Sequence, residues 1–406
     1  MLGASLLSSL SWLLAPRSAR ADASLGAEPV PGVPVLLCVF LRGAADGLNV
    51  VVPYADDEYY RLRPSIAVPR PGLRGGALDL DGRFGLHPQL KPLLPAYRAG
   101  ELALVHAVGS PHPTRSHFEA QDFMESGVVG DRTVSRGWLG RYFASKPAIG
   151  AGALRAVAVT ARAPLSLRGY ADALSTSSLR DFRLQSSPEL EPALLRGFQR
   201  LYRVDGADLA ERAGQRALGA TELVARALRS QRSRARYARD TRDFADLARL
   251  IKADVGLEAA WLDLGGWDTH RQQGSSGAGD LPRQLDRLAR GLAAFRADLG
   301  EAFGRVVVVV MSEFGRTAKE NGTRGTDHGH GGTMLVLGGQ VKGGRVLGDL
   351  QSLAPDQLYQ GRDVPVLTDF RQLLSEVCER HLGIADAAGF FPGFQRDDAR
   401  RLALFG

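Results

Sequence analysis

Residues 305–317 read RVVVVVMSEFGRT, an apolar run that gives way abruptly to polar side chains. A run of this length without polar alternation predicts a strand that is buried on both faces. Such a strand needs helices on both sides of its sheet, so the stretch indicates an α/β fold. It also places Ser312, Glu313 and Arg316 just beyond the carboxyl end of the strand.

The rest of the chain alternates between similar apolar runs and helical patterns. Further strands are expected at 35–41, 101–108, 153–160, 257–264 and 333–338, and helices at 88–99, 281–300 and 368–382. This alternation predicts a three-layer α/β/α sandwich with a mostly parallel sheet, in a single domain over 35–406. The segment from about 187 to 254 has Leu, Ala and Arg at helical spacing, and we expect a helical insertion with a solvated arginine face.

The N-terminus has the features of an export signal. Residues 2–15, LGASLLSSLSWLLA, are apolar but short for a membrane span, and Ala19 and Ala21 fit a cleavage site. The expected signal peptide covers 1–21 and lacks its positive start, which a start codon placed too far downstream would explain together with the loss of any twin-arginine motif. A Pro-rich spacer follows at 22–34.

These features predict an exported protein, periplasmic or extracellular, that meets the export machinery and keeps no stable membrane span after processing. The alternative is a hydrophobic N-terminal helix that stays in the mature protein.

The charge balance is basic without pointing to nucleic acid. The formal charge of +7 comes from 46 Arg and 5 Lys against 44 Asp and Glu, spread along the chain. The sequence has no RNP-type aromatic motif, helix-turn-helix signature or zinc-finger spacing. We therefore expect a solvated basic surface that attracts anionic substrates, small or polymeric, and no nucleic-acid partner.

Polar residues follow the predicted strands at the ends where α/β sheets bind ligands. In chain order they are Arg42, Asp46, Thr114, Ser116, His117, Asp268, His270, Ser312, Glu313, Arg316, Asp327, His328 and His330. Four strand ends and one glycine-rich loop, GTDHGHGG at 325–332, thus supply carboxylates and imidazoles to one edge of the sheet.

A set of carboxylates and imidazoles is typical of a transition-metal site. The candidate ligands are Asp46, Asp268, His270, Glu313, Asp327, His328 and His330, enough for one or two ions. Mixed ligands of this kind favour zinc, manganese or iron, whereas calcium, a further possibility, prefers oxygen. The glycines of the loop are expected to adopt positive φ, so that neighbouring side chains turn toward one point.

Two of these residues have simpler alternatives. His270 could satisfy a backbone group, and Glu313 could pair only with Arg316. His87, His106 and His381 are interpreted as structural, since His106 falls within a predicted strand and His381 at a helix end.

A nucleophile is expected at the loop-to-helix junction PTRSHF, 113–118. Ser116 would lie at a helix N-terminus, where backbone N–H groups favour an anion and a metal could activate the hydroxyl. The alternative is N-capping, with Glu119 completing a capping box, and the two roles are compatible. Arg42, Arg115 or Arg316 would steady the anionic oxygens of a substrate.

Six ordered motifs carry a family resemblance over nearly the whole chain after the signal. LRGAADGLNVVVPY, PTRSHFEAQDFMESG, GGWDTH, MSEFGRT, GTDHGHGG and VKGG resemble domain-of-unknown-function family 1501. That family is exported in many bacteria, often by the twin-arginine route, and is distantly similar to the alkaline phosphatase and sulfatase superfamily. The resemblance implies an alkaline-phosphatase-like sandwich.

The superfamily pattern also implies roles for individual residues. Asp46 resembles its first metal-binding aspartate, Ser116 its nucleophile, and Asp268 and His270 the pair that holds one ion. Glu313 stands where an Asp-His pair usually follows a strand, and His328 or His330 resembles the late metal histidine.

The chain departs from the superfamily pattern at three places. The D-T-H spacing of Asp268 and His270 is shorter than usual, and Phe314 replaces a histidine after Glu313. Pro111 occupies the nucleophile position of the sulfatase signature, which argues against a formylglycine mechanism.

The sequence therefore predicts an exported metal-dependent hydrolase of phosphate or sulfate esters that uses a metal-activated serine or hydroxide. The alternative is an exported binding or envelope-assembly protein with a degenerate metal site.

Overall fold

The computed structural model describes residues 29–146, 154–184, 186–187, 189–202 and 209–406. The expected signal peptide and the first part of the Pro-rich spacer lie outside the described residues. No helix in the described part of the chain is both long enough and apolar enough to cross a bilayer.

A nine-stranded sheet forms the centre of the molecule. Its order is β11-β5-β10-β9-β1-β8-β6-β7, and β12 pairs with β5. The strands are β1 (Val35–Arg42), β5 (Leu102–Gly109), β6 (Ala156–Val159), β7 (Leu174–Thr176), β8 (Ala259–Gly265), β9 (Val306–Met311), β10 (Gly332–Gly338), β11 (Arg345–Leu347) and β12 (Thr368–Asp369). All pairings are parallel except those of β10, which runs antiparallel to both β5 and β9.

The central strands are buried on both faces, as their composition requires. Along β1, Leu37 and Val39 belong to one hydrophobic cluster, whereas Leu36, Cys38 and Phe40 belong to another. Successive side chains of a strand point to opposite faces, so each cluster fills one side of the sheet. The valine run of β9 is fully buried in the same way.

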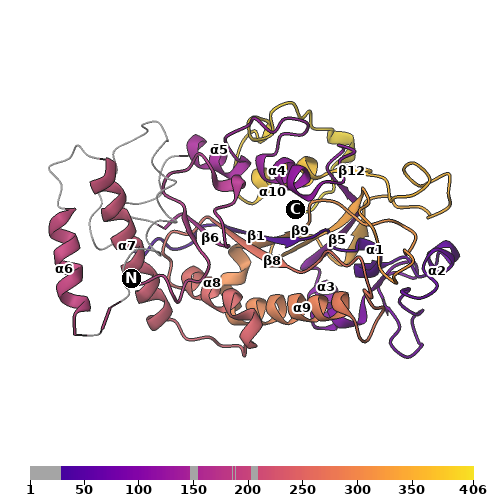
Figure 1. Ribbon diagram of the computed structural model, residues 1–406, viewed down its shortest axis with the longest axis horizontal. Helices are drawn as coiled ribbons and strands as arrows, with labels where there is room; N and C mark the ends of the chain where they lie inside the picture. Colours follow the sequence, from indigo (N-terminus) through magenta and orange to yellow (C-terminus); the bar gives the residue numbers. More distant parts are fainter. Residues whose placement is uncertain (1–28, 147–153, 185, 188, 203–208) are drawn as a thin grey trace.

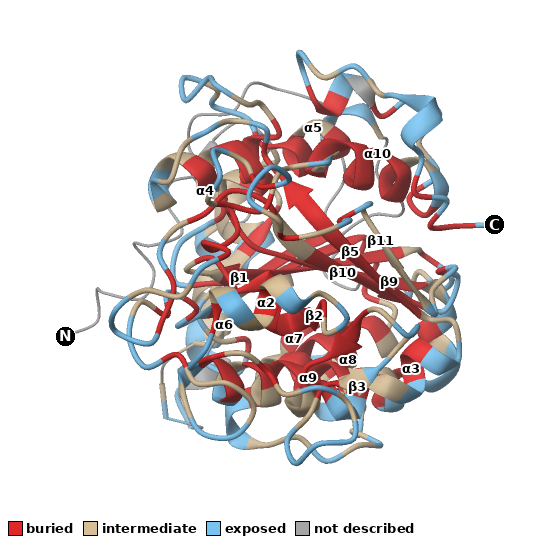
Figure 2. Ribbon diagram, turned by 90° about the vertical axis from the view of Figure 1, so that its right-hand side faces the viewer, coloured by how far each residue is buried: buried red, intermediate tan, exposed pale blue. Residues whose placement is uncertain are grey.

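Helices cover each face of the sheet, which confirms the predicted three-layer α/β/α sandwich (Figures 1 and 2). One side holds α3 (Leu94–Arg98), α8 (Arg242–Lys252) and α9 (Asp280–Leu299). The other holds α4 (His117–Ser126), α5 (Trp138–Ser145) and α10 (Phe370–Arg380).

The remaining elements lie at the margins of the sandwich. They are α1 (Gly47–Val50), α2 (Asp57–Leu62), α6 (Glu191–Leu201), α7 (Leu209–Ser230), a small sheet of β2 (Val51–Val52), β4 (Gly85–Leu86) and β3 (Leu78–Asp79), and the 3-10 helices η2 (Pro88–Leu93), η3 (Leu165–Leu167), η4 (Arg239–Thr241), η5 (Gly300–Arg305), η6 (Ala388–Phe390) and η7 (Asp398–Arg400). Within the expected helical insertion, α6 and α7 project to one side, whereas Phe244 of α8 packs on Phe295 of α9 (Figure 1).

The predicted strands are present with boundaries shifted by a few residues, and one helix differs in kind. The helix expected at 88–99 is a 3-10 helix followed by the short α3. Pro88, Pro92 and Pro95 lack the N–H groups that a continuous α-helix requires. The short strands β7, β11 and β12 carry no long apolar run and were not predicted.

Candidate metal centre

The carboxyl ends of β1, β8 and β9 meet at one edge of the sheet, where the polar residues gather. β8 leads to Asp268 and His270, and β9 leads to Glu313. Because β10 is antiparallel, the loop before it reaches the same edge and delivers His328. The chain from β5 enters α4 at His117, which also lies there.

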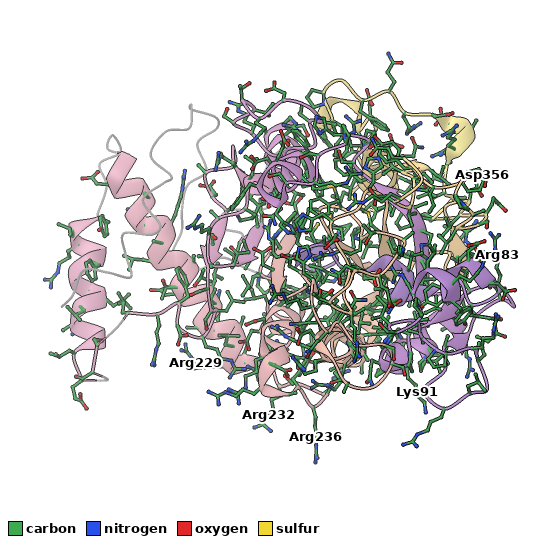
Figure 3. The ribbon with its side chains drawn as sticks, turned by 45° about the vertical axis from the view of Figure 1, so that its right-hand side comes forward. Arg83, Lys91, Arg229, Arg232, Arg236 and Asp356 are labelled. Atoms are coloured by element: carbon green, nitrogen blue, oxygen red, sulfur yellow. The ribbon has the colours of Figure 1, made fainter. Side chains whose placement is uncertain are left out.

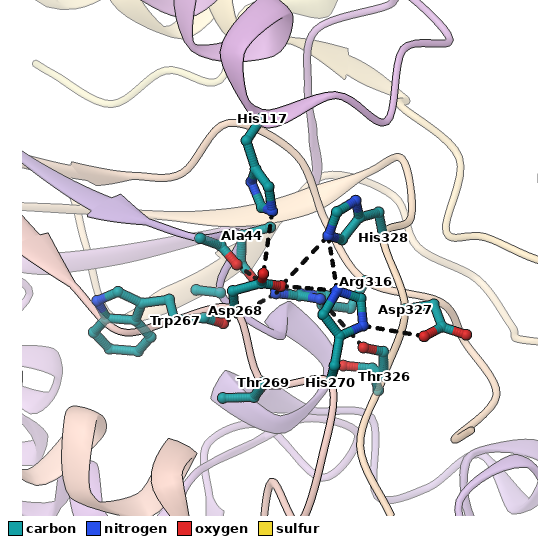
Figure 4. Close-up of polar contacts among 12 residues, drawn as sticks. Ala44, His117, Trp267, Asp268, Thr269, His270, Arg316, Thr326, Asp327 and His328 are labelled. Atoms are coloured by element: carbon teal, nitrogen blue, oxygen red, sulfur yellow. Dashed lines mark hydrogen bonds and ion pairs between the residues drawn. The ribbon is translucent and has the colours of Figure 1, made fainter. Parts of the chain in front are cut away.

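Three histidines surround the carboxylate of Asp268 (Figure 4). Asp268 Oδ1 lies 3.1 Å from His270 Nε2 and 3.4 Å from His328 Nε2. Asp268 Oδ2 lies 3.5 Å from His117 Nε2. The ligand atoms of His117, Asp268 and His328 all lie within 4.8 Å of one another, a spacing that suits a metal ion.

The hydrogen bonds of the histidines fix which ring nitrogen faces the centre. His117 Nδ1 lies 2.8 Å from Glu313 Oε1, and His328 Nδ1 lies 2.8 Å from the carbonyl oxygen of Arg115. His270 Nδ1 lies 3.1 Å from Asp327 Oδ1. Carboxylate and carbonyl oxygens only accept hydrogen bonds, so each Nδ1 carries the proton and donates it.

The three Nε2 atoms therefore present lone pairs to a shared space. The Nε2 atoms of His270 and His328 are only 2.9 Å apart, and His117 Nε2 is buried without a hydrogen bond. A cation placed among these atoms and the Asp268 carboxylate would relieve the repulsion between their lone pairs. A divalent metal ion satisfies all of these atoms at once, and the donor set fits zinc or manganese.

The surroundings of Asp268, His328 and Asp327 favour the protonation states that can bind a metal. Burial alone would raise the pKa of Asp268, but the hydrogen bond and charge of Arg316 hold that pKa below its usual value. Burial lowers the pKa of His328, which favours the neutral ring. A hydrogen bond from Asn321 lowers the pKa of Asp327, so this carboxylate stays ionised beside His270.

Glu313 lies behind the histidines instead of among the ligands. Its carboxylate is fully buried and accepts hydrogen bonds from His117 Nδ1, Gln121 Nε2, the Gly43 N–H and Ser312 Oγ. Burial acts to raise the pKa of Glu313, but hydrogen bonds, first those from His117 and Gln121, together with the charge of His117 bring this pKa below its usual value. Glu313 thus orients the His117 ring, as the carboxylate does in a carboxylate–histidine–metal arrangement.

Arg316 is buried next to Asp268 and holds the surrounding loops through hydrogen bonds. Its guanidinium donates to Asp268 and to the carbonyl oxygens of Gly43, Ala44, Trp267 and Thr326. These bonds use its donors, and its side chain has no exposed surface. Arg316 therefore ties the loops after β1, β8 and β9 together, and it does not face an incoming substrate.

Two other predicted ligands lie apart from the three-histidine cluster. Asp46 is buried, accepts two hydrogen bonds from Arg63 at 2.6 and 2.9 Å, and accepts one from Gln273. His330 is buried and its ring stacks on Tyr359 with centroids 4.4 Å apart. Among the described residues, one group has the spacing for a metal ion, namely His117, Asp268 and His328.

The predicted arginines and Ser116 also have defined places. Arg42 pairs with Glu125 at 2.6 Å and Asp263 at 3.0 Å. Ser116 occupies the N-cap position of α4, directly before His117, but its side chain makes no cap hydrogen bond. The capping-box alternative is therefore wrong, because Glu119 accepts from Thr114 instead.

The glycine-rich loop approaches its neighbours closely but does not use left-handed backbone. The expectation of positive φ is wrong, since none of its glycines is in that region and the residue that is, Arg324, precedes the loop. A Cβ on Gly329 would lie 2.3 Å from the Arg316 carbonyl carbon, and one on Gly331 would lie 2.3 Å from the Pro365 carbonyl oxygen. Glycine is needed here because backbone segments touch.

His117 is a candidate ligand that sequence reasoning did not select. It was recognised as a strand-end residue, but Ser116 beside it was preferred for a chemical role. The remaining predicted histidines behave as expected: His87, His106 and His381 each contact a backbone carbonyl oxygen, those of Ser275, Val51 and Val35.

The cluster is open to solvent. The side chains of His117 and His328 are each 24% exposed, and that of Asp268 is 44% exposed. Structural zinc sites are closed by four protein ligands, whereas catalytic sites leave room for water or substrate.

Comparisons with known proteins show which family the chain belongs to. No curated protein matches the chain. Two solved structures that resemble it are both of the C-terminal periplasmic domain of EcEptC from Escherichia coli. One is 9% identical, with a TM-score of 0.39, and the match covers 95% of this chain and 92% of that chain.

The other structure, a complex with Zn, is 11% identical, with a TM-score of 0.36 and coverage of 80% and 77%. TM-scores of this size do not establish a shared fold or a shared activity. The family model described as "Protein of unknown function (DUF1501)" matches residues 34–390, which is most of the chain and includes every residue of the metal centre. The chain therefore belongs to the DUF1501 family.

Proposed function

We propose that this protein is an exported metal-dependent hydrolase that cleaves phosphate or sulfate esters. The observation that carries the proposal is the convergence of three Nε2 lone pairs on the carboxylate of Asp268, in a place that solvent reaches. His117, Asp268 and His328 would hold the ion, with His270 beside them. The ion would polarise a substrate oxygen and lower the pKa of a coordinated water molecule.

The protein's own residues prepare this centre before any ligand arrives. Glu313 and Asp327 hold the rings of His117 and His270 by their Nδ1 atoms. Arg316 fixes the carboxylate of Asp268 from the buried side. Preorganised groups of this kind stabilise developing charge without rearranging during the reaction.

An excess of positive charge beside the centre supports an anionic substrate. Arg115 and Arg362 both pair with the single buried carboxylate of Asp363, at 2.6 and 3.3 Å. The backbone of Arg115 accepts from His328, and Arg362 donates to the His328 carbonyl oxygen. Two guanidinium groups that share one carboxylate leave one positive charge next to a candidate ligand, which would attract a phosphate or sulfate group.

Ser116 and a water molecule are the two candidate nucleophiles. The exposed hydroxyl of Ser116 makes no cap hydrogen bond and precedes His117 in the chain. Ser116→Ala separates these possibilities. Loss of turnover with unchanged metal content assigns attack to the serine, whereas retained turnover assigns it to water.

Turnover of synthetic esters tests the function. Metal is first removed from the protein with a chelator. The protein is then reloaded with zinc, manganese or calcium and assayed with a phosphate monoester, a phosphate diester and a sulfate ester. We expect turnover of at least one ester that requires metal and is abolished by Asp268→Ala. If the metal-loaded protein hydrolyses none of them, the proposal fails in favour of a binding protein with a catalytically silent site.

A further inference from the structure

Helix α6 lies at one extremity of the molecule and packs on α7 with one of its faces (Figure 1). The ring of Tyr202, just after α6, lies against Gly214 of α7, and Gln215 donates to the Tyr202 carbonyl oxygen. Phe198 stacks on Tyr202 from one turn earlier in the helix. This face accounts for part of the apolar content of α6.

In the part of the chain that the structure describes, the other apolar face of α6 is not covered. Leu190, Leu194 and Leu201 are 59%, 41% and 65% exposed. Residues four and seven positions apart in an α-helix fall on the same side, so the three leucines form one line. Single exposed leucines are common, but a line of three on one helix marks a surface for an apolar partner.

The arm formed by α6, α7 and the residues that directly follow α7, 189–236, is rich in positive charge. Arg196 and Arg200 are exposed on the polar side of α6, away from the leucine line, because residues one or two positions apart in a helix do not share a face. Residues 189–236 contain ten arginines and six carboxylates, a formal excess of four positive charges. At the end of α7 and just after it, Arg229, Arg232 and Arg236 are exposed and point outward (Figure 3).

We infer that α6 binds the surface of a membrane that contains anionic lipids. The leucine line would enter the boundary between headgroups and acyl chains, while Arg196 and Arg200 contact lipid phosphates. With 11 residues, α6 is too short to cross a bilayer and would lie along its surface. A second copy of the chain is the poorer occupant, because it would bring two positively charged arms together.

Co-sedimentation with lipid vesicles tests this inference independently of the metal centre. Vesicles of phosphatidylcholine with phosphatidylglycerol are compared with vesicles of phosphatidylcholine alone. We expect the full protein to bind the anionic vesicles and to be released by salt. The double variant Leu194→Asp/Leu201→Asp should bind at least about tenfold less, because the apolar insertion is lost.

Two further variants keep the test decisive. Leu73→Asp alters a leucine that is 62% exposed far from α6 and should bind like the unmodified protein. Arg196→Gln/Arg200→Gln leaves the leucines in place and should weaken binding to anionic vesicles only. Equal binding to neutral vesicles, or undiminished binding by a normally folded leucine variant, would overturn the inference; so would dimer formation without vesicle binding.

Discussion

At the residue scale, the orientation of the His117 ring is set by the side chain of Glu313 behind it. The ring nitrogen Nδ1 of His117 donates a hydrogen bond to Glu313, and this leaves Nε2 facing Asp268. The hydrogen bond that His117 donates to Glu313 also raises the pKa of His117, which makes the ring a stronger base and would make it a better metal ligand. The local sequence SHFE does not predict this contact, because Glu313 lies 196 residues away in the chain.

Substitution of Glu313 should weaken metal binding without removing a ligand. In Glu313→Gln the amide oxygen can still accept from His117, but the negative charge is lost. We expect a reduction of about 10–100-fold in zinc affinity, measured by competition with a chromogenic chelator. The control is Glu119→Gln on the same helix, whose carboxylate contacts Thr114, and its affinity should be unchanged. An unaltered affinity in Glu313→Gln would show that this carboxylate does not support the centre.

At the element scale, the antiparallel direction of β10 decides how the glycine-rich loop contributes. Because β10 begins where β9 ends, the loop crosses the site edge of the sheet before entering β10. The composition of β10 predicted its existence but not its direction, since apolar runs look alike in either orientation. The packing of Gly329 and Gly331 against other backbone segments likewise depends on partners distant in sequence.

Alanine at Gly331 should disturb the loop that carries His328. The added Cβ would lie 2.3 Å from the Pro365 carbonyl oxygen, so backbone must move. We expect destabilisation by about 1–3 kcal/mol, read from denaturant unfolding, together with weaker zinc binding. The matched control is Gly322→Ala, an exposed glycine nearby with nothing within 4 Å of an added Cβ. Similar stability of the two variants would contradict the close packing.

At the scale of the whole molecule, the sequence predicted the architecture better than the centre. The valine run of β9 and the similar run of β1 are unambiguous, because strands buried on both faces need continuous apolar side chains. Asp268, His270 and His328 were found because strand ends meet at one edge of an α/β sheet. Asp46 could not be separated from them, since its partner Arg63 becomes its neighbour only through folding.

Two buried histidines should make the folded state sensitive to acid. Burial lowers the pKa of both His87 and His106 to about 4, against about 6.5 in an unfolded chain. The unfolded state therefore binds more protons between these values, and stability falls as the pH drops from about 6.5 to about 4. The loss between pH 7 and pH 5 should be about 2 kcal/mol for each histidine.

Denaturant unfolding at pH 7 and pH 5, with a chelator present to exclude metal effects, measures this dependence. His106→Gln should show a smaller difference between the two pH values than the unmodified protein, even if its stability at pH 7 is lower. An equal difference in both proteins would mean that His106 is not held neutral by burial.

The metal content of the native protein tests the central claim most directly. Elemental analysis of the purified, uncleaved chain should find about one transition-metal ion per chain, and this ion should be lost in His117→Ala and Asp268→Ala. His330→Gln should retain it, because His330 stacks on Tyr359 away from the cluster. Two results would contradict a centre built on His117, Asp268 and His328. One is an unmodified protein that contains no metal and takes up neither zinc nor manganese; the other is a metal content in His117→Ala and Asp268→Ala equal to that of the unmodified protein.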